Sequence, residues 1–239
     1  MNNHTKKQIS LLVGSPKKKN SASATLGLYL CNKLDPGKFT YQAIYLHSVF
    51  FEKEKNLSNW LDDTLKSDII IFSSPLYVDC LPSYVFQAFE RIYQGMIEAR
   101  KNKDMQFLAI TNSGFPESSQ SQIALDICHH FVRAANMRWL GGLSLGAGFI
   151  LTGKDLRKMG WFVRNVKKSL DVSAIAINKG ETILDESVRL MGKPLLGKKL
   201  FCWLGNMGFK QMARRKGTIQ QLYDRPYEKK NNDSPILSS

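Results

Sequence analysis

The chain has 239 residues, of which 43% are hydrophobic and 23% are charged, and its formal net charge is +14 at pH 7. This composition is ordinary for a globular protein with a substantial core and excludes a low-complexity chain. The four cysteines, Cys31, Cys80, Cys128 and Cys202, are far apart in the sequence, which favours a reducing compartment over a disulfide framework. No apolar run is long enough to span a bilayer and the polar N-terminus has no signal-like apolar segment, so we expect a cytoplasmic protein.

The positive charge is concentrated at the two ends of the chain. Residues 1–20 contain five lysines and no acidic residue, and residues 189–239 contain eleven Lys or Arg against three Asp or Glu. The intervening part contributes only +1 to the total. Such a distribution attracts anionic partners or ligands, although solvated surface lysines are the simpler interpretation of any charge run.

Short apolar strands alternate with amphipathic helices along the first three quarters of the chain. The predicted strands are 8–13, 40–46, 68–72, 105–111 and 138–145, and the predicted helices are 22–34, 57–66, 82–100, 120–136 and 155–177. Five strands that alternate with helices predict an α/β fold, with one parallel sheet between two helical layers and right-handed crossovers.

The loop after the first predicted strand has the features of a phosphate site. It turns at Gly14-Ser15-Pro16 and passes through a Lys/Asn/Ser segment into a helix that we expect to begin near Ser21 or Ser23. Free N–H groups in the first turn of a helix, together with the helix dipole, favour an anion. The candidate ligands are the side chains of Ser15, Lys17, Asn20, Ser21 and Ser23 and the backbone N–H of Ala22. An ordinary capped turn with solvated lysines is the alternative.

Two better-known phosphate loops are excluded by the glycine spacing. After Gly14 the next glycine is Gly27, whereas the Walker loop and the dinucleotide fingerprint need closely spaced glycines. Lys18 and Lys19 would add positive charge to the loop without making it either motif.

Two further loops follow buried strands and end at the same predicted edge of the sheet. The strand at 68–72 is followed by Ser73-Ser74-Pro75-Leu76-Tyr77, and the strand at 105–111 ends in Thr111-Asn112-Ser113-Gly114-Phe115. Ligands of open α/β sheets bind at the carboxyl edge of the strands, so three such loops in register predict one binding site.

Together the three loops resemble those of the NAD(P)H-dependent FMN reductase branch of the flavodoxin-like proteins. The matching patterns are G-S-P-K followed by Asn and Ser, S-P-x-Y-x-x-x-L-P at 74–82, and T-N-S-G at 111–114. The resemblance covers about residues 8–150 and implies the flavodoxin-like strand order 2-1-3-4-5 in a three-layer sandwich. It implies an FMN whose ring lies between Pro75, Leu76, Tyr77 and Val78 on one side and Asn112, Ser113, Gly114 and Phe115 on the other. The iron–sulfur relatives of this family carry a compact cysteine cluster, which this sequence lacks.

The resemblance implies an FMN-dependent oxidoreductase that takes hydride from NADH or NADPH. The acceptor would be a small molecule such as a quinone, a nitro compound or a flavin, and a homodimer is expected. No catalytic side chain can be named, since the flavin supplies the chemistry. We expect no metal site, because His129-His130 has no partner ligands at helical spacing. A non-catalytic electron carrier and a flavin-free scaffold protein are the alternatives, although flavodoxins that act as carriers are typically acidic.

The C-terminal part is the least familiar. We expect a flavodoxin-like domain at residues 1–180 and a basic, helical extension at residues 181–239, with the last ten or so residues disordered. Apolar residues recur at near-helical spacing after Leu196, but Gly197, Gly205 and Gly208 weaken any single long helix. We expect the extension to pack on the domain or a dimer partner, in preference to an anionic membrane surface, and we expect no nucleic-acid binding because no known module is present.

Overall fold

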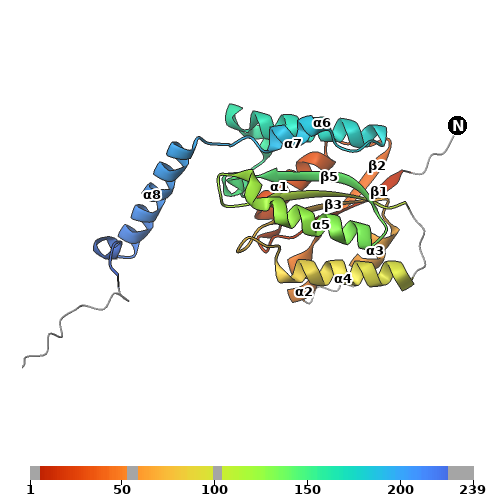
Figure 1. The fold of residues 1–239 in the computed structure, drawn as a ribbon, viewed down its shortest axis with the longest axis horizontal. Coiled ribbons are helices and arrows are strands. Elements are labelled where there is room, and N and C mark those ends of the chain that lie inside the picture. Colours follow the sequence, from red (N-terminus) through yellow and green to blue (C-terminus); the bar gives the residue numbers. More distant parts are fainter. Residues whose placement is uncertain (1–5, 53–58, 99–103, 226–239) are drawn as a thin grey trace, which may run out of the picture. The chain divides into compact units, whose positions relative to one another are not determined.

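The computed structural model describes residues 6–52, 59–98 and 104–225 of the chain. They fall into two units, Met1–Leu196 and Gly197–Ser239, which are described separately. The first unit is an α/β sandwich and the second is helical (Figure 1).

One parallel sheet forms the centre of the first unit. Its strands are β1 (Lys7–Val13), β2 (Phe39–Tyr45), β3 (Ile69–Pro75), β4 (Gln106–Asn112) and β5 (Arg138–Leu145). They are paired in parallel in the order β2-β1-β3-β4-β5, which confirms the order implied by the resemblance. β3 and β4 are buried along almost their whole length, which explains their unbroken apolar sequences. β2 lies on one side of β1, and β3, β4 and β5 follow on the other side. The direction of the strand order therefore reverses between β1 and β3.

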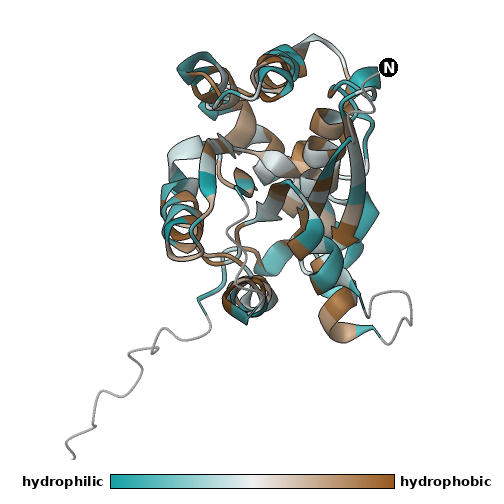
Figure 2. Ribbon diagram, turned by 90° about the vertical axis from the view of Figure 1, so that its right-hand side faces the viewer, coloured by the Kyte–Doolittle hydropathy of each residue, from teal (hydrophilic) through white to brown (hydrophobic). Residues whose placement is uncertain are grey.

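Helices cover both faces of this sheet (Figure 1). One face carries α1 (Ala22–Cys31), α6 (Arg164–Lys179) and α7 (Asp185–Met191), and the other carries α2 (Leu46–Phe51), α3 (Trp60–Lys66), α4 (Ser83–Glu98) and α5 (Gln122–Ala134). Hydrophobic and hydrophilic residues both occur around these helices (Figure 2), as expected for helices with one buried side.

Aromatic packing fixes the core between the sheet and α4–α5. The rings of Phe72 and Phe89 have centroids 5.1 Å apart, and Phe89 is stacked on Phe131 of α5 at 4.2 Å. On the opposite face α1 approaches β1 closely, because a Cβ on Gly27 would lie only 2.5 Å from a methyl of Leu11. The core is therefore built on both faces of the sheet.

The predicted helix at 155–177 is wrong in its first part. Two short 3-10 turns, Leu156–Lys158 and Trp161–Val163, precede α6, which begins at Arg164. The carboxylate of Asp155 caps the first turn by accepting from the backbone N–H of Arg157, and Gly160 then has extended backbone that ends any helix. The short helices α2 and α7 have no counterpart among the predicted elements.

The division between the units falls after Leu196, so residues 181–196, which the sequence assigned to the extension, lie in the first unit. α7 is held to α6 by a bond from the Ser169 hydroxyl to the carbonyl of Ser187, at 2.7 Å. The residues expected to be disordered at the end of the chain lie outside the described part.

The second unit contains one long helix, α8 (Lys198–Arg215), followed by a 3-10 turn at Ile219–Gln221. Gly205 and Gly208 lie inside α8, which is continuous although glycine is expected to weaken a helix. Each costs about 1 kcal/mol relative to alanine, which the other helix-forming residues offset. Among the described residues, no helix is long and apolar enough to cross a membrane.

Candidate functional site

The loop after β1 is pressed against the loop after β3, and glycine at position 14 makes this possible. A Cβ on Gly14 would lie 2.5 Å from the Ser74 Oγ and 2.8 Å from its Cβ. The Gly14 N–H donates to the carbonyl of Ser73 at 2.8 Å, and the Tyr84 hydroxyl donates to the carbonyl of Gly14 at 3.0 Å. The first two predicted loops are thus joined through backbone atoms.

Ser21 caps α1. Its hydroxyl accepts from the N–H of Ala24 at 3.0 Å and donates to the carbonyl of Lys18 at 2.6 Å. Because its one proton is already donated, the Ser21 hydroxyl shapes the loop and is not a free donor for a ligand. The backbone N–H groups of Ala22 and Ser23 have no partner among the residues that the structure describes. Two amides at the N-terminus of a ten-residue helix are therefore available to an anion.

Asn112, at the end of β4, connects the three loops. Its side-chain amide donates to the Ser23 hydroxyl at 2.8 Å and to the carbonyl of Ser74 at 3.1 Å. The Leu76 N–H donates to the carbonyl of Asn112 at 2.9 Å. The Ser73 hydroxyl donates to the carbonyl of Ser23 at 2.8 Å. These bonds fix the relative positions of the loops before any ligand arrives.

The three loops surround a cavity of about 220 Å³. Eleven of the fourteen residues proposed from the sequence line it: Ser15, Lys17, Ser21, Ala22, Ser23, Pro75, Leu76, Tyr77, Asn112, Ser113 and Gly114. The cavity lies at the carboxyl edge of β1, β3 and β4, where the strand order reverses. Residues that are far apart in the sequence are thus brought to one site.

Three proposed residues do not line this cavity. Asn20 lines a different one, and Val78 and Phe115 are 99% and 49% exposed. Tyr77 and Cys80 exchange backbone hydrogen bonds of 2.8 and 3.2 Å across a tight turn, at whose tip lies Val78. Both central residues have left-handed backbone, with φ of 50° at Val78 and 59° at Asp79. This turn directs Val78 to solvent, and it was not predictable because valine rarely adopts such a φ.

Phe149 and Thr152 were not predicted, and they line the cavity from the loop after β5. That loop is held to the third loop by a bond from the Gly148 N–H to the carbonyl of Ser113 at 2.9 Å. A Cβ on Gly148 would lie 2.8 Å from Asn112, so the close contact requires glycine. The glycine-rich segment Gly146-Ala147-Gly148 after the fifth strand was the available signal for a fourth loop.

The three lysines of the first loop differ in their surroundings. Lys17 lines the cavity, Lys19 lines the second cavity described below, and Lys18 forms an ion pair with Glu52. Hydrogen bonding to the Lys18 ammonium lowers the pKa of the Glu52 carboxyl. Lys17 is therefore the lysine of this loop with direct access to an anion in the cavity.

Two tyrosines near the loops are neutral over the physiological range. Burial raises the pKa of Tyr84 to about 12. Burial also raises the pKa of Tyr77, and a hydrogen bond with Ser15 opposes part of that effect. Tyr77 thus reaches the first loop as an uncharged group.

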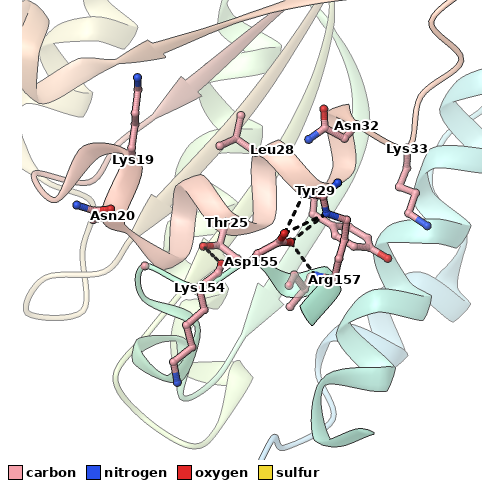
Figure 3. Close-up of a pocket in the computed structure, with 12 residues that line it drawn as sticks. Lys19, Asn20, Thr25, Leu28, Tyr29, Asn32, Lys33, Lys154, Asp155 and Arg157 are labelled. Carbon is pink, nitrogen blue, oxygen red and sulfur yellow. Dashed lines mark hydrogen bonds and ion pairs between the residues drawn. The ribbon is translucent and has the colours of Figure 1, made fainter. Parts of the chain in front are cut away.

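A second cavity, of about 350 Å³, lies beside α1 (Figure 3). Its polar groups are largely engaged with one another: Arg157 pairs with Asp155 at 2.9 Å, and the Thr25 hydroxyl bonds the carbonyl of Lys154 at 3.1 Å. Lys33, which also lines this cavity, pairs at 3.1 Å with Asp171, which does not. Although this cavity is larger, it lacks the free helix amides and the converging strand ends of the first. The smaller cavity is the better candidate for function.

Comparisons with known proteins bear on the fold. No family model matches the sequence, and no curated protein matches it. Among solved structures, an NADH:FMN oxidoreductase is similar with a TM-score of 0.52 and 17% identity, over 79% of this chain and 96% of that one. An NAD(P)H:quinone oxidoreductase from Methanothermobacter marburgensis gives a TM-score of 0.53 and 12% identity, over 72% and 96%. A Trp repressor binding protein from Bacillus subtilis is similar with a TM-score of 0.50 and 13% identity, over 68% of this chain and 95% of that one.

The first unit has the flavodoxin-like fold. The fold expected from the three loop motifs is thereby confirmed. In flavodoxin-like sheets the ligand site lies at the switch point between β1 and β3, and the cavity described above occupies that position. The residues that line the cavity at this position include Lys17, Ala22, Ser23 and Asn112.

Proposed function

We propose that the chain is an FMN-dependent oxidoreductase that takes hydride from NADH or NADPH and reduces a small acceptor such as a quinone, a nitro compound or a flavin. The observation that carries this proposal is the convergence of eleven motif residues on one cavity at the switch point of the sheet. The names of two similar structures, an NADH:FMN and an NAD(P)H:quinone oxidoreductase, agree with it.

The residues of the first loop fit a monophosphate. The N–H groups of Ala22 and Ser23 are unpartnered among the described residues, and the Ser15 hydroxyl and Lys17 line the same cavity. A single anion site at one helix N-terminus suits FMN better than FAD, which would need its second phosphate bound as well. In this proposal Ser21 acts only as the helix cap.

The second and third loops fit the flavin ring. Pro75, Leu76 and Tyr77 of the second loop line the cavity together with Asn112, Ser113 and Gly114 of the third loop. A bound flavin would supply the redox chemistry, by accepting hydride and giving up electrons to an acceptor. The protein would bind the phosphate, orient the ring and keep the loops in position through Asn112.

We also propose a homodimer and a reducing, cytoplasmic compartment. Tyr77 and Phe149 line the cavity and yet are 46% and 57% exposed, so a second copy or an apolar acceptor has an aromatic surface to cover. All four cysteines are free, which suits a reducing compartment. Light scattering tests the dimer: the monomer mass at micromolar concentration would contradict it.

The function is tested by the visible spectrum of purified protein loaded with FMN. We expect rapid bleaching of the flavin by NADH or NADPH under anaerobic conditions, followed by reoxidation when a quinone is added. A flavin that is bound but not bleached would support the electron carrier instead. A protein that takes up no FMN would support the scaffold.

A further inference from the structure

The helix α8 leaves its apolar side chains uncovered by its own unit. Among the residues of α8 only Ala213 is buried. The exposed apolar side chains are Leu200, Trp203, Leu204, Met207, Phe209 and Met212, with exposed fractions between 37% and 65%. A run of six large apolar side chains on one helix needs a partner, because such surfaces are rare on proteins that have none.

The same helix is strongly cationic. α8 contains Lys198, Lys199, Lys210, Arg214 and Arg215 and no acidic residue. Over the described part of the second unit, residues 197–225, seven Lys or Arg face one acidic residue, Asp224, which gives a net charge of +6. The partner of this helix should therefore be anionic.

Cationic and apolar side chains are interleaved around α8. Lys199, Lys210 and Arg214 are spaced by eleven and four residues, which places them on one narrow side of a helix. Trp203 and Met207 share a groove with Lys210 and Arg214 on this side. Lys198 and Arg215 lie among the other large apolar side chains around the rest of the helix. The long stems of Lys210 and Arg214 can lie along the apolar surface of Trp203 and Met207 while their charged ends reach an anionic headgroup.

We propose that α8 docks the chain on an anionic lipid surface. The exposed apolar side chains would enter the boundary between headgroups and acyl chains, and the neighbouring Lys210 and Arg214 would contact lipid phosphates. The docking is peripheral, because no described helix is long and apolar enough to cross a membrane. A protein partner was the expectation from the sequence. An anionic lipid surface accounts for both the charge of +6 and the exposed apolar side chains.

The test is co-sedimentation of the full chain with vesicles. We expect binding to vesicles of phosphatidylcholine mixed with phosphatidylglycerol and none to phosphatidylcholine alone. Binding should be lost as salt rises from about 0.1 M to about 1 M, because the Debye length falls from about 10 Å to about 3 Å. Absence of binding to the anionic vesicles at the lower salt would overturn the proposal.

Two double variants separate the contributions of charge and apolar contact. Lys210→Glu with Arg214→Glu should weaken partitioning by about 30-fold or more, since each basic residue near an anionic surface contributes about fivefold and the reversed charges add repulsion. Arg133→Glu with Lys179→Glu makes the same charge change on the first unit, where both residues are exposed, and should leave binding within about twofold. An equal loss in both variants would mean that net charge alone drives binding, which contradicts docking by α8.

Trp203→Ala with Leu204→Ala keeps the charge and removes apolar contact. We expect vesicle binding to fall about tenfold or more. Trp161→Ala is the matched control, because Trp161 is 77% exposed in the first unit. If the α8 variant changes the mass measured by light scattering and leaves vesicle binding intact, the apolar side chains of α8 contact a second copy of the chain. If vesicle binding is unchanged by the α8 variant while duplex DNA binds as tightly as the vesicles, the helix is a general polyanion site. Either result would overturn the proposal.

Discussion

Ser15 and Asn20 have the same expected role in the sequence but different positions in the structure. Ser15 is buried and lines the cavity of the three loops, whereas Asn20 lines the second cavity. We predict that Ser15→Ala weakens FMN binding by about 1.5–3 kcal/mol, the contribution of one hydrogen bond to a charged group. Asn20→Ala should leave FMN affinity unchanged. Titration followed by flavin fluorescence measures both, and equal losses would mean that the phosphate lies nearer Asn20.

Gly148 is required by its contact with Asn112. A Cβ there would lie 2.8 Å from both Cβ and Oδ1 of Asn112, so the asparagine would have to move away from its bonds to Ser23 and Ser74. We predict that Gly148→Ala lowers the free energy of unfolding by about 1–3 kcal/mol, as overpacking does, and also weakens FMN binding. Gly114→Ala is the control for stability, because an added Cβ there meets nothing within 4 Å. Urea unfolding with no difference between the two variants would show that the loops tolerate the shift.

The turn between Tyr77 and Cys80 stores strain at the element scale. Val78 has a φ of 50°, a region that a β-branched residue enters only at a cost, while asparagine tolerates it. We predict that Val78→Asn raises the free energy of unfolding by about 0.5–1 kcal/mol. Val188→Asn is the control, in the middle of α7 at a position that is 43% exposed. It should change the free energy of unfolding little, because valine and asparagine have similar helix propensities. A lower thermal midpoint for Val78→Asn would show that the valine makes a compensating contact.

Hydrophobic periodicity was sufficient to predict the five strands that build the sheet. The strand at 138–145 has the predicted bounds, and the other four strands differ from prediction by a few residues at their ends. The segment 155–163 was not predictable in this way, because its helical pattern is interrupted by the backbone of Gly160 and the Asp155 cap. The short helices α2 and α7 are six and seven residues long, too short for a periodic signal.

The sequence motifs were sufficient to predict the residues that line the cavity where a loop follows its strand directly. They could not assign Ser21 to capping or pair Lys18 with Glu52, since both depend on how the loop folds back in three dimensions. Phe149 and Thr152 come from a loop to which the resemblance gave no role. Sequence motifs thus located the site, whereas contacts between distant segments determined which residues reach it.

At the scale of the whole molecule, the boundary at Leu196 predicts how the chain tolerates truncation. A chain that ends at Leu196 should keep its thermal midpoint and its FMN affinity, because it retains the complete first unit. A chain that ends at Arg189 should be destabilised, because it lacks Leu190, Met191 and Leu195, which are all buried. Circular dichroism melting compares the two. Loss of stability in the longer of the two chains as well would support the expectation that the extension packs on the first unit.

The central claim is that the amides at the start of α1 hold the phosphate of FMN. The most direct test compares the affinities of FMN and riboflavin, which differ only by that phosphate, in one fluorescence titration of the full chain. Two amide bonds to an anion at about 1.5–3 kcal/mol each predict that FMN binds about 100-fold or more tightly than riboflavin. Equal affinities for the two flavins would contradict the claim.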